Sequence, residues 1–157
     1  MVTKMSEDKK LVIILIRGLV NLHPDVKKTL DLLRLKQKHA CVVIDDNEVN
    51  RGMLQRLKDY TTYGTIDEAF FALMLEKRGQ TVGKEEIKVD FKKVAKEYFS
   101  GKVKLRDFET NYNVKPFFRL HPPKGGFERG GIKMPFAKKG VLGQRGDAIS
   151  LLIAKML

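Results

Sequence analysis

An uninterrupted apolar run near the start of the chain constrains the fold more than any other feature. Residues 11–16 read Leu-Val-Ile-Ile-Leu-Ile, with no alternation between apolar and polar side chains. A strand in a sheet with one solvated face would alternate, because successive side chains point to opposite faces. We therefore predict a strand that is covered on both faces.

The next 50 residues predict a small α+β unit around this strand. Amphipathic helices are expected at 24–35 and 50–60, and further strands at 40–44 and 61–66. The resulting order is strand, helix, strand, helix, strand, which is typical of a compact α+β module. Two helices can cover one face of such a sheet. Something after residue 66 must cover the other face, so the C-terminal part should pack back on the module.

The rest of the chain predicts a helical extension that carries one long loop. Helices are expected at 67–78, at 84–99, near 103–108 and from Asp147 onward, and residues 115–120 should be extended. Residues 121–140 are rich in glycine, proline and cations and contain no helical or strand pattern. Loops of this length inside a compact protein are functional or disordered. The terminal apolar helix tethers the far end of this loop.

The charge balance indicates a polyanionic partner. The 157 residues hold 31 Lys and Arg against 19 Asp and Glu, a net charge of +12 with a pI near 9.8. Basic and acidic side chains number 12 and 8 in residues 1–66, 10 and 9 in 67–110, and 9 and 2 in 111–157. The C-terminal third therefore carries more than half of the excess.

Composition also argues against several classes of protein. No apolar run approaches the roughly 20 residues of a membrane span, and the polar start of the chain predicts no secretory signal. We expect a cytosolic protein that does not enter a membrane. The single cysteine, Cys41, lies in an apolar run and excludes an intramolecular disulfide.

The glycine-rich loop fits RNA better than a nucleotide phosphate. It has neither the G-x-x-x-x-G-K-[ST] pattern nor a G-x-G-x-x-G between a strand and a helix. Its cations can meet phosphates and its aromatic side chains can stack on unpaired bases. These side chains are Lys124, Arg129, Lys133, Lys138 and Lys139, with Phe127 and Phe136 among them. The alternative is a disordered linker with scattered charge, which the tethering at both ends disfavours.

Evidence for catalysis is weak. The three histidines are dispersed, and no serine or cysteine has the local setting of a nucleophile. Asp45 and Asp46 follow a strand, where a turn is a commoner role than metal binding. An enzyme that uses Asp45, Asp46 and His121 remains an alternative without supporting spacing. We predict no catalytic residues, no metal, no cofactor and no small-molecule substrate.

Two segments resemble a known ribosomal family. Residues 16–67 read IRGLVNLHPDVKKTLDLLRLKQKHACVVIDDNEVNRGMLQRLKDYTTYGTID, and residues 118–147 read FRLHPPKGGFERGGIKMPFAKKGVLGQRGD. The first resembles protein thirty of the large ribosomal subunit. The second is similar to the long archaeal form of that family and to its eukaryotic counterpart, protein seven of the large subunit.

The resemblance implies a fold and a role in translation. It implies a ferredoxin-like, three-stranded, mainly antiparallel sheet with two helices, plus a C-terminal helical extension. Residues 1–66 would form the rRNA-binding core, and 67–157 the extension with the basic loop at 121–146. The protein would be a non-enzymatic constituent of the cytoplasmic ribosome. Its partners would be 23S-type rRNA near the 5S rRNA, 5S rRNA itself and neighbouring ribosomal proteins.

The resemblance and the charge pattern together predict the contact residues. In the core they are Arg17, Asn21, Arg34, Lys36, Lys38, His39, Asn50 and Arg51. In the extension they are Arg119, His121, Lys124, Phe127, Arg129, Lys133, Lys138, Lys139 and Arg145. We expect Arg17 and Arg51 to lie on one edge of the module. The alternative is an RNA-binding regulator or RNA chaperone outside the ribosome, which stoichiometric presence in mature large subunits would distinguish.

Overall fold

The computed structural model describes residues 9–81, 83 and 90–157, and its first five elements follow the expected order. They are β1 (Lys9–Leu15), α1 (Pro24–Leu32), β2 (Ala40–Ile44), α2 (Glu48–Leu57) and β3 (Thr61–Asp67). β1 pairs antiparallel with both β2 and β3. These three strands and two helices confirm the predicted three-stranded antiparallel core.

The extension adds helices and two short strands. Its elements are α3 (Glu68–Arg78), α4 (Phe91–Phe99), the 3-10 helix η1 (Leu105–Asp107), α5 (Phe108–Tyr112), β4 (Phe118–Arg119), the 3-10 helix η2 (Phe136–Lys138), β5 (Gly143–Gly146) and α6 (Ile149–Met156). The sheet order is β4-β2-β1-β3-β5. β4 is antiparallel to β2, whereas β5 is parallel to β3. The extension therefore widens the sheet by one strand at each edge.

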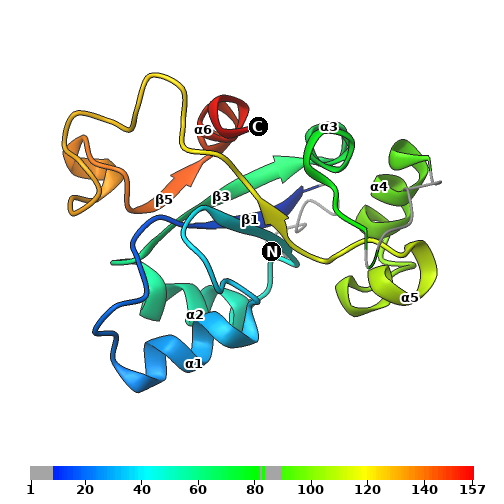
Figure 1. Ribbon diagram of the computed structural model, residues 1–157, viewed down its shortest axis with the longest axis horizontal. Helices are drawn as coiled ribbons and strands as arrows, with labels where there is room; N and C mark the ends of the chain where they lie inside the picture. Colours follow the sequence, from blue (N-terminus) through cyan, green and yellow to red (C-terminus); the bar gives the residue numbers. More distant parts are fainter. Residues whose placement is uncertain (1–8, 82, 84–89) are drawn as a thin grey trace, which may run out of the picture.

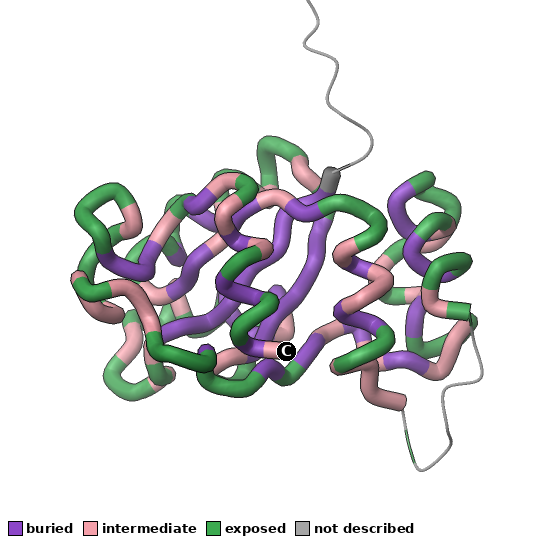
Figure 2. The backbone as a smooth tube through the Cα atoms, turned by 90° about the horizontal axis from the view of Figure 1, so that it is seen from above, coloured by how far each residue is buried: buried purple, intermediate pink, exposed green. Residues whose placement is uncertain are grey.

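Both faces of β1 are covered, as the apolar run predicts. Leu11, Ile13 and Leu15 face a core cluster with α1 and α2, and Val12 and Ile14 face a second cluster formed with residues after 66. β2 and residues 10–15 of β1 are buried throughout, and Figure 2 shows long buried stretches of chain in this region. Figure 1 shows α1 and α2 on one side of the sheet and α3 and α6 on the other.

Five buried aromatic side chains from the extension belong to the second cluster, and they are Phe71, Tyr98, Phe99, Phe108 and Phe118. Phe71 of α3 packs within 5.3 Å of the Tyr98 ring and 6.3 Å of the Phe108 ring, measured between ring centroids. The Tyr98 hydroxyl donates a hydrogen bond of 2.7 Å to the carbonyl oxygen of Val43 in β2. The extension is thus joined to the first module by apolar packing and by a buried polar contact.

α1 ends earlier than its hydrophobic pattern suggests because a Schellman motif closes it. The Leu35 amide donates to the Leu30 carbonyl at 2.9 Å, and the Arg34 amide donates to the Asp31 carbonyl at 3.1 Å. This geometry needs a left-handed residue after the helix, and Arg34 has φ +60°. The turn sends Leu35 back into the core with Leu30, where both are buried.

Other boundaries differ where a side chain caps a helix. α2 begins at Glu48 because the Asn47 side chain accepts a hydrogen bond of 2.8 Å from the Asn50 amide. The helix predicted at 84–99 is seen from Phe91, and its predicted start, including Ile87 and Lys88, lies outside the described residues. Asp147 is not the cap of α6, which starts at Ile149. Instead it accepts a hydrogen bond from Thr65 at 2.7 Å.

β5 is a strand that the sequence did not predict. Residues 143–146 fall at the end of the stretch interpreted as loop, and they carry no strand pattern. They pair with β3 because Gly64 leaves room: a Cβ there would lie 2.2 Å from the Gly146 carbonyl oxygen and 2.8 Å from the Ile149 side chain. A tertiary contact, rather than local propensity, makes this strand.

Candidate nucleic-acid interface

The sheet register gathers several strand ends at one place. Leu15, the last residue of β1, pairs with Thr61, the first residue of β3. Ala40 at the start of β2 pairs with Arg119 at the end of β4. β5 enters the sheet at this same end. The segments that follow or precede these strand ends must therefore lie near one another.

Three such segments carry most of the predicted contact residues. We call this end of the molecule the basic end and define it by the segments that reach it, residues 17–23, 36–39 and 119–142. In Figure 1 the segment after β1 and the loop before β5 both lie at the left. The extension thus adds its charge to the same end at which the first module places its own.

The loop of the basic end presents exposed cations that form no ion pair within the described part of the chain. Its exposed cations are Lys124, Arg129, Lys133, Lys138 and Lys139. None of the five forms an ion pair with any residue that the structure describes. Unpaired, solvated cations keep their full attraction for a polyanion and release its counterions on binding.

The loop has a defined backbone and is held by its own hydrogen bonds. The Gly130 amide donates to the Lys139 carbonyl at 2.9 Å, and the Val141 amide donates to the Met134 carbonyl at 2.9 Å. At Gly140 a Cβ would lie 2.1 Å from the Met134 carbonyl oxygen. Glycine therefore serves close packing of the loop against itself. This differs from a flexible linker, in which glycine would serve mobility.

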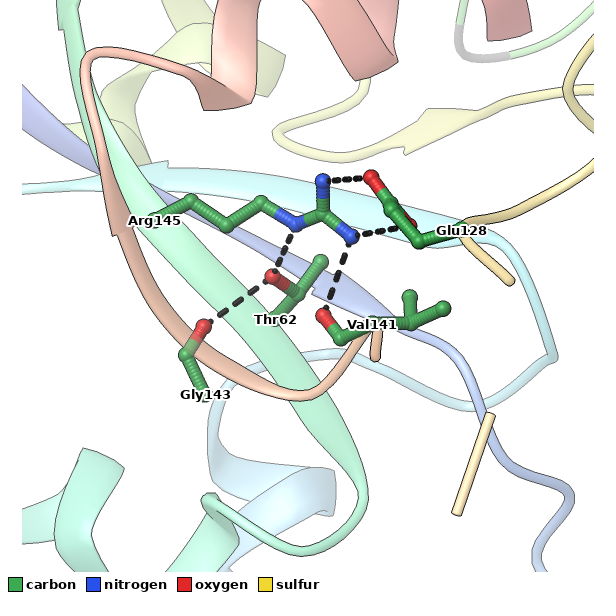
Figure 3. Close-up of polar contacts among 5 residues, drawn as sticks. All are labelled: Thr62, Glu128, Val141, Gly143 and Arg145. Atoms are coloured by element: carbon green, nitrogen blue, oxygen red, sulfur yellow. Dashed lines mark hydrogen bonds and ion pairs between the residues drawn. The ribbon is translucent and has the colours of Figure 1, made fainter. Parts of the chain in front are cut away.

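A buried arginine anchors the loop to the sheet. The Arg145 side chain is only 2% exposed and forms a two-pronged ion pair with Glu128 of the loop, one prong at 2.7 Å. It also donates to the Thr62 hydroxyl at 2.9 Å and to the Val141 carbonyl at 3.1 Å. The guanidinium carbon lies 4.8 Å from the centre of the Phe136 ring. Figure 3 shows Glu128, Thr62 and Val141 around the Arg145 guanidinium.

Arg145 must consequently be removed from the predicted contact residues. A guanidinium buried against Glu128 and Thr62 has no surface to offer a phosphate. Glu128 is the acid that sequence reasoning overlooked, although it is the single carboxylate in residues 121–146. The hydrogen bond from Arg145 lowers the pKa of Glu128, despite partial burial. The pair orders the loop that carries the exposed cations.

An aromatic contact joins the loop to the first module. The His39 ring stacks on Phe127 with centroids 6.1 Å apart and planes 22° apart. Burial, and to a lesser extent the charge of Lys38, lowers the pKa of His39 and so favours the neutral ring. The His39 Nδ1 atom is buried with no hydrogen-bond partner in the described part of the chain. Phe127 is thus half-buried and packs against His39, and it is also one of the predicted base contacts.

The remaining predicted residues of the basic end have distinct environments. Arg17 is half-buried, with its guanidinium carbon 5.4 Å from the Tyr60 ring centre and a donated hydrogen bond of 3.3 Å to the Asp59 carbonyl. Asn21 is exposed with φ +58°, a conformation that asparagine tolerates. The other exposed side chains are Lys36, Lys38, Arg119 and His121, and Arg34 is half-buried next to this group.

The opposite end of the sheet is also charged, but its charges are paired. Leu11 pairs with Ile44, so the residues that flank this pair lie far along the strands from the basic end. We call this the paired end and define it by Lys10, Asp45, Asp46, Asn50 and Arg51. The expectation that Arg17 and Arg51 share an edge is wrong, because antiparallel pairing places the end of β1 opposite the start of β2.

At the paired end, the cationic and amide side chains contact Asp45 and Asp46. Arg51 forms a two-pronged ion pair with Asp46, at 2.5 and 2.7 Å, and this hydrogen bonding raises the pKa of Arg51. Lys10 pairs with Asp45. The Asn50 side chain donates to the Asp45 carbonyl at 2.8 Å. Asp45 and Asp46 therefore form a turn with cationic partners.

The described residues contain no constellation typical of an enzyme. Asp45 and Asp46 lie at the paired end, whereas His121 follows β4 at the basic end. Within residues 9–81, 83 and 90–157, no three His, Cys, Asp or Glu side chains gather as metal ligands would. No helix in these residues is long and apolar enough to cross a membrane.

These features define a basic α+β protein whose sheet is covered on both faces and whose basic end carries a loop of exposed cations without ion pairs in the described residues. The sequence model of the family described as ribosomal protein L30p/L7e matches residues 11–61. Similar proteins named large ribosomal subunit protein uL30 occur in Methanopyrus kandleri, 40% identical over 90% of this chain and 99% of the relative, and in Staphylothermus marinus, 41% identical over 92% and 96%. A third, in Ignicoccus hospitalis, is 40% identical over 95% and 99%. The chain belongs to this ribosomal-protein family, in which its role is structural and not enzymatic.

Proposed function

We propose that this constituent of the large ribosomal subunit binds rRNA through its basic end. Membership of the family supports a structural role in the cytoplasmic ribosome. The rRNA partner is of the 23S type, in the region near the 5S rRNA, and neighbouring ribosomal proteins complete the contacts. Residues 1–66 act as the rRNA-binding core, and 67–157 as the extension that supplies the loop.

One observation carries the proposal: the five exposed loop cations lack partners within the described chain, although the loop that bears them is ordered. An ordered loop has already lost its conformational entropy, so less of the attraction to phosphate is spent on ordering. The cations at the paired end, by contrast, are held by Asp45 and Asp46. The proposal therefore includes the basic end and Arg34, and it excludes Asn50, Arg51 and Arg145.

A charge-neutralising variant tests this assignment. Replacing Lys133, Lys138 and Lys139 by glutamine removes three exposed positive charges without removing packing. The matched control replaces Lys92, Lys93 and Lys96, which are exposed on α4 and change the net charge equally. Each protein is titrated against refolded large-subunit rRNA at several salt concentrations.

We expect the loop variant to bind more weakly and with a lower dependence on salt. Three lost phosphate contacts should reduce the slope of log K against log salt by about 2–3. The α4 control should keep nearly the wild-type slope. Equal effects of the two triple variants would show that only net charge matters and would contradict the assignment of the loop. Tight binding of transfer or messenger RNA in place of rRNA would favour the regulator alternative.

A further inference from the structure

A concave pocket lies where the first module meets the extension. Its volume is about 400 Å³, within the range of about 300–1,000 Å³ that small-molecule sites occupy. Its lining residues come from the segment between α1 and β2, from the start of β2, from α5, from β4 and from the residue before β4, and they are Arg34, Lys36, Gln37, Ala40, Glu109, Phe117 and Arg119. The first module alone would have only one wall of this pocket.

Three cations line the pocket and have no acidic partner. Arg34, Lys36 and Arg119 form no ion pair with a residue in the described part of the chain, although the Glu109 carboxylate lines the same pocket. The guanidinium carbon of Arg119 lies 5.9 Å from the centre of the Phe117 ring. The pocket therefore combines a strong anion-binding capacity with an aromatic surface.

Phe117 differs from the aromatic side chains that pack in the core of the extension. It is half-buried, yet it belongs to neither core cluster, whereas its neighbour Phe118 is buried in the core. An aromatic ring that stabilises no core is available to stack on a ligand. Stacking of a nucleic-acid base on such a ring is worth about 1–3 kcal/mol per base.

Arg34 occupies a backbone position that favours glycine. It is the left-handed residue of the Schellman motif after α1, with φ +60°. A side chain in this conformation costs stability that glycine would recover. Strained positions of this kind collect at binding sites, and the Arg34 side chain lines the pocket.

We propose that this pocket receives one unpaired nucleotide of the bound RNA, with its phosphate between Arg34 and Arg119 and its base stacked on Phe117. The inference rests on the proposed rRNA binding and adds the form of RNA that is recognised. A paired base cannot serve, because both of its faces are already stacked within the helix and RNA sequence is read chiefly at unpaired bases. Glu109 repels a second phosphate and so leaves its side of the pocket to the base.

Four variants separate the base from the phosphate. Phe117→Leu removes stacking but keeps an apolar side chain, and Phe117→Tyr keeps the stacking surface. Arg34→Gly removes one phosphate contact and relieves the left-handed strain. Arg56→Gln is the control, because Arg56 is exposed on α2 outside the pocket. Each is measured by salt-dependent binding to refolded large-subunit rRNA and by thermal unfolding.

The variants should differ in which quantity changes, the affinity or the salt slope, as well as in the size of the change. Phe117→Leu should weaken binding about tenfold with an unchanged salt slope, and Phe117→Tyr should bind like the wild type. Arg34→Gly should lower the salt slope by about one while its unfolding temperature does not fall. The loss of affinity without loss of stability would show that Arg34 is retained for binding.

Two outcomes overturn the inference in distinguishable ways. If the wild type binds rRNA with a steep salt dependence, but the Phe117→Leu and Arg34→Gly variants bind like Arg56→Gln, the pocket is not a nucleotide site and the proposed function stands. If the wild type itself shows no salt-dependent rRNA binding, the proposed function fails and the pocket inference fails with it. Ultraviolet cross-linking of RNA to the peptide that contains Phe117 supports the base position, whereas cross-links confined to 121–140 count against it.

Discussion

The two ends of the sheet contain similar side chains and differ in what those side chains contact. At the paired end, Lys10 and Arg51 meet Asp45 and Asp46. At the basic end, the exposed loop cations meet no carboxylate of the described chain. The comparison shows that a positive net charge does not locate a binding surface. The pairing state of the cations excludes the paired end, because a paired cation must first release its own counter-charge.

The loop of the basic end is anchored by Arg145, which is the one buried arginine among the described residues. Arg145 and Arg51 both form two-pronged ion pairs, but the Arg145 side chain is 2% exposed and the Arg51 side chain is 67% exposed. An exposed pair contributes little to stability because water screens it. Removing one partner of a buried pair lowers stability strongly, because the other charge and its neighbours stay desolvated.

The largest expected difference between the two ends follows from these pairs. Arg145→Met should lower the free energy of unfolding by about 2–3 kcal/mol, near the low end for a buried pair because Glu128 is partly exposed. Arg51→Met should leave the free energy of unfolding unchanged within error. Urea unfolding of both variants measures the contrast. Equal losses would mean that the Arg145 pair is no more structural than the exposed one.

Arg145→Met should also release the loop that it anchors. We expect proteases to cut residues 121–142 faster in this variant than in Arg51→Met, since Glu128 would lose its tie to the sheet. The affinity for rRNA should fall although the buried Arg145 is not among the proposed contact residues. Unchanged loop protection with weaker binding would instead indicate that Arg145 reaches the RNA directly.

A pair of glycine substitutions gives the next largest contrast. Gly140→Ala in the basic loop should cost about 1–2 kcal/mol, because the added methyl would lie 2.1 Å from the Met134 carbonyl oxygen. Gly52→Ala in α2, at the paired end, should stabilise the protein by about 0.5–1 kcal/mol, since nothing lies within 4 Å of its Cβ position and alanine favours a helix. Thermal unfolding of both variants gives the sign of each change. Stabilisation by Gly140→Ala would show that the loop is not packed against itself.

The smallest expected effect is a pH dependence confined to the basic end. The hydrogen bond from Arg145 lowers the pKa of Glu128 below 4.5 in the folded state. Its stabilising contribution is therefore complete above pH 4.5 and is lost as the pH falls through the lower, folded-state value. The stability difference between wild type and Glu128→Gln should be constant near neutrality and shrink in acid. Urea unfolding at several pH values measures it, and a difference independent of pH would contradict the pairing.

Much of the fold could be predicted because its signals are local. The apolar run of β1, the periodicity of α1 and the breaks between elements place the first five elements within a few residues. Helix ends were less accurate, since they depend on contacts such as the Schellman hydrogen bonds around Arg34. β5 could not be predicted, because its pairing depends on the space beside Gly64 and not on its own residues.

The candidate site was predicted in composition more than in arrangement. The lysines of the sequence indicate a basic loop. Nothing local, however, distinguishes the buried Arg145 from the exposed Arg129, since each is followed by a glycine. Phe117 and Glu109 of the pocket were missed for a related reason. They are separated in sequence from Arg34, and only the return of β4 to the edge of β2 brings them together.

The sequence by itself determined that this protein has a sheet covered on both faces and a strongly basic C-terminal third. Both properties are sums over many residues. Neither the burial of apolar runs nor the attraction to polyanions depends on the exact positions of side chains. Only the tertiary structure decided which cations are free. Ion pairing depends on distances of a few ångströms between residues far apart in the chain, and antiparallel register, not sequence order, sets those distances.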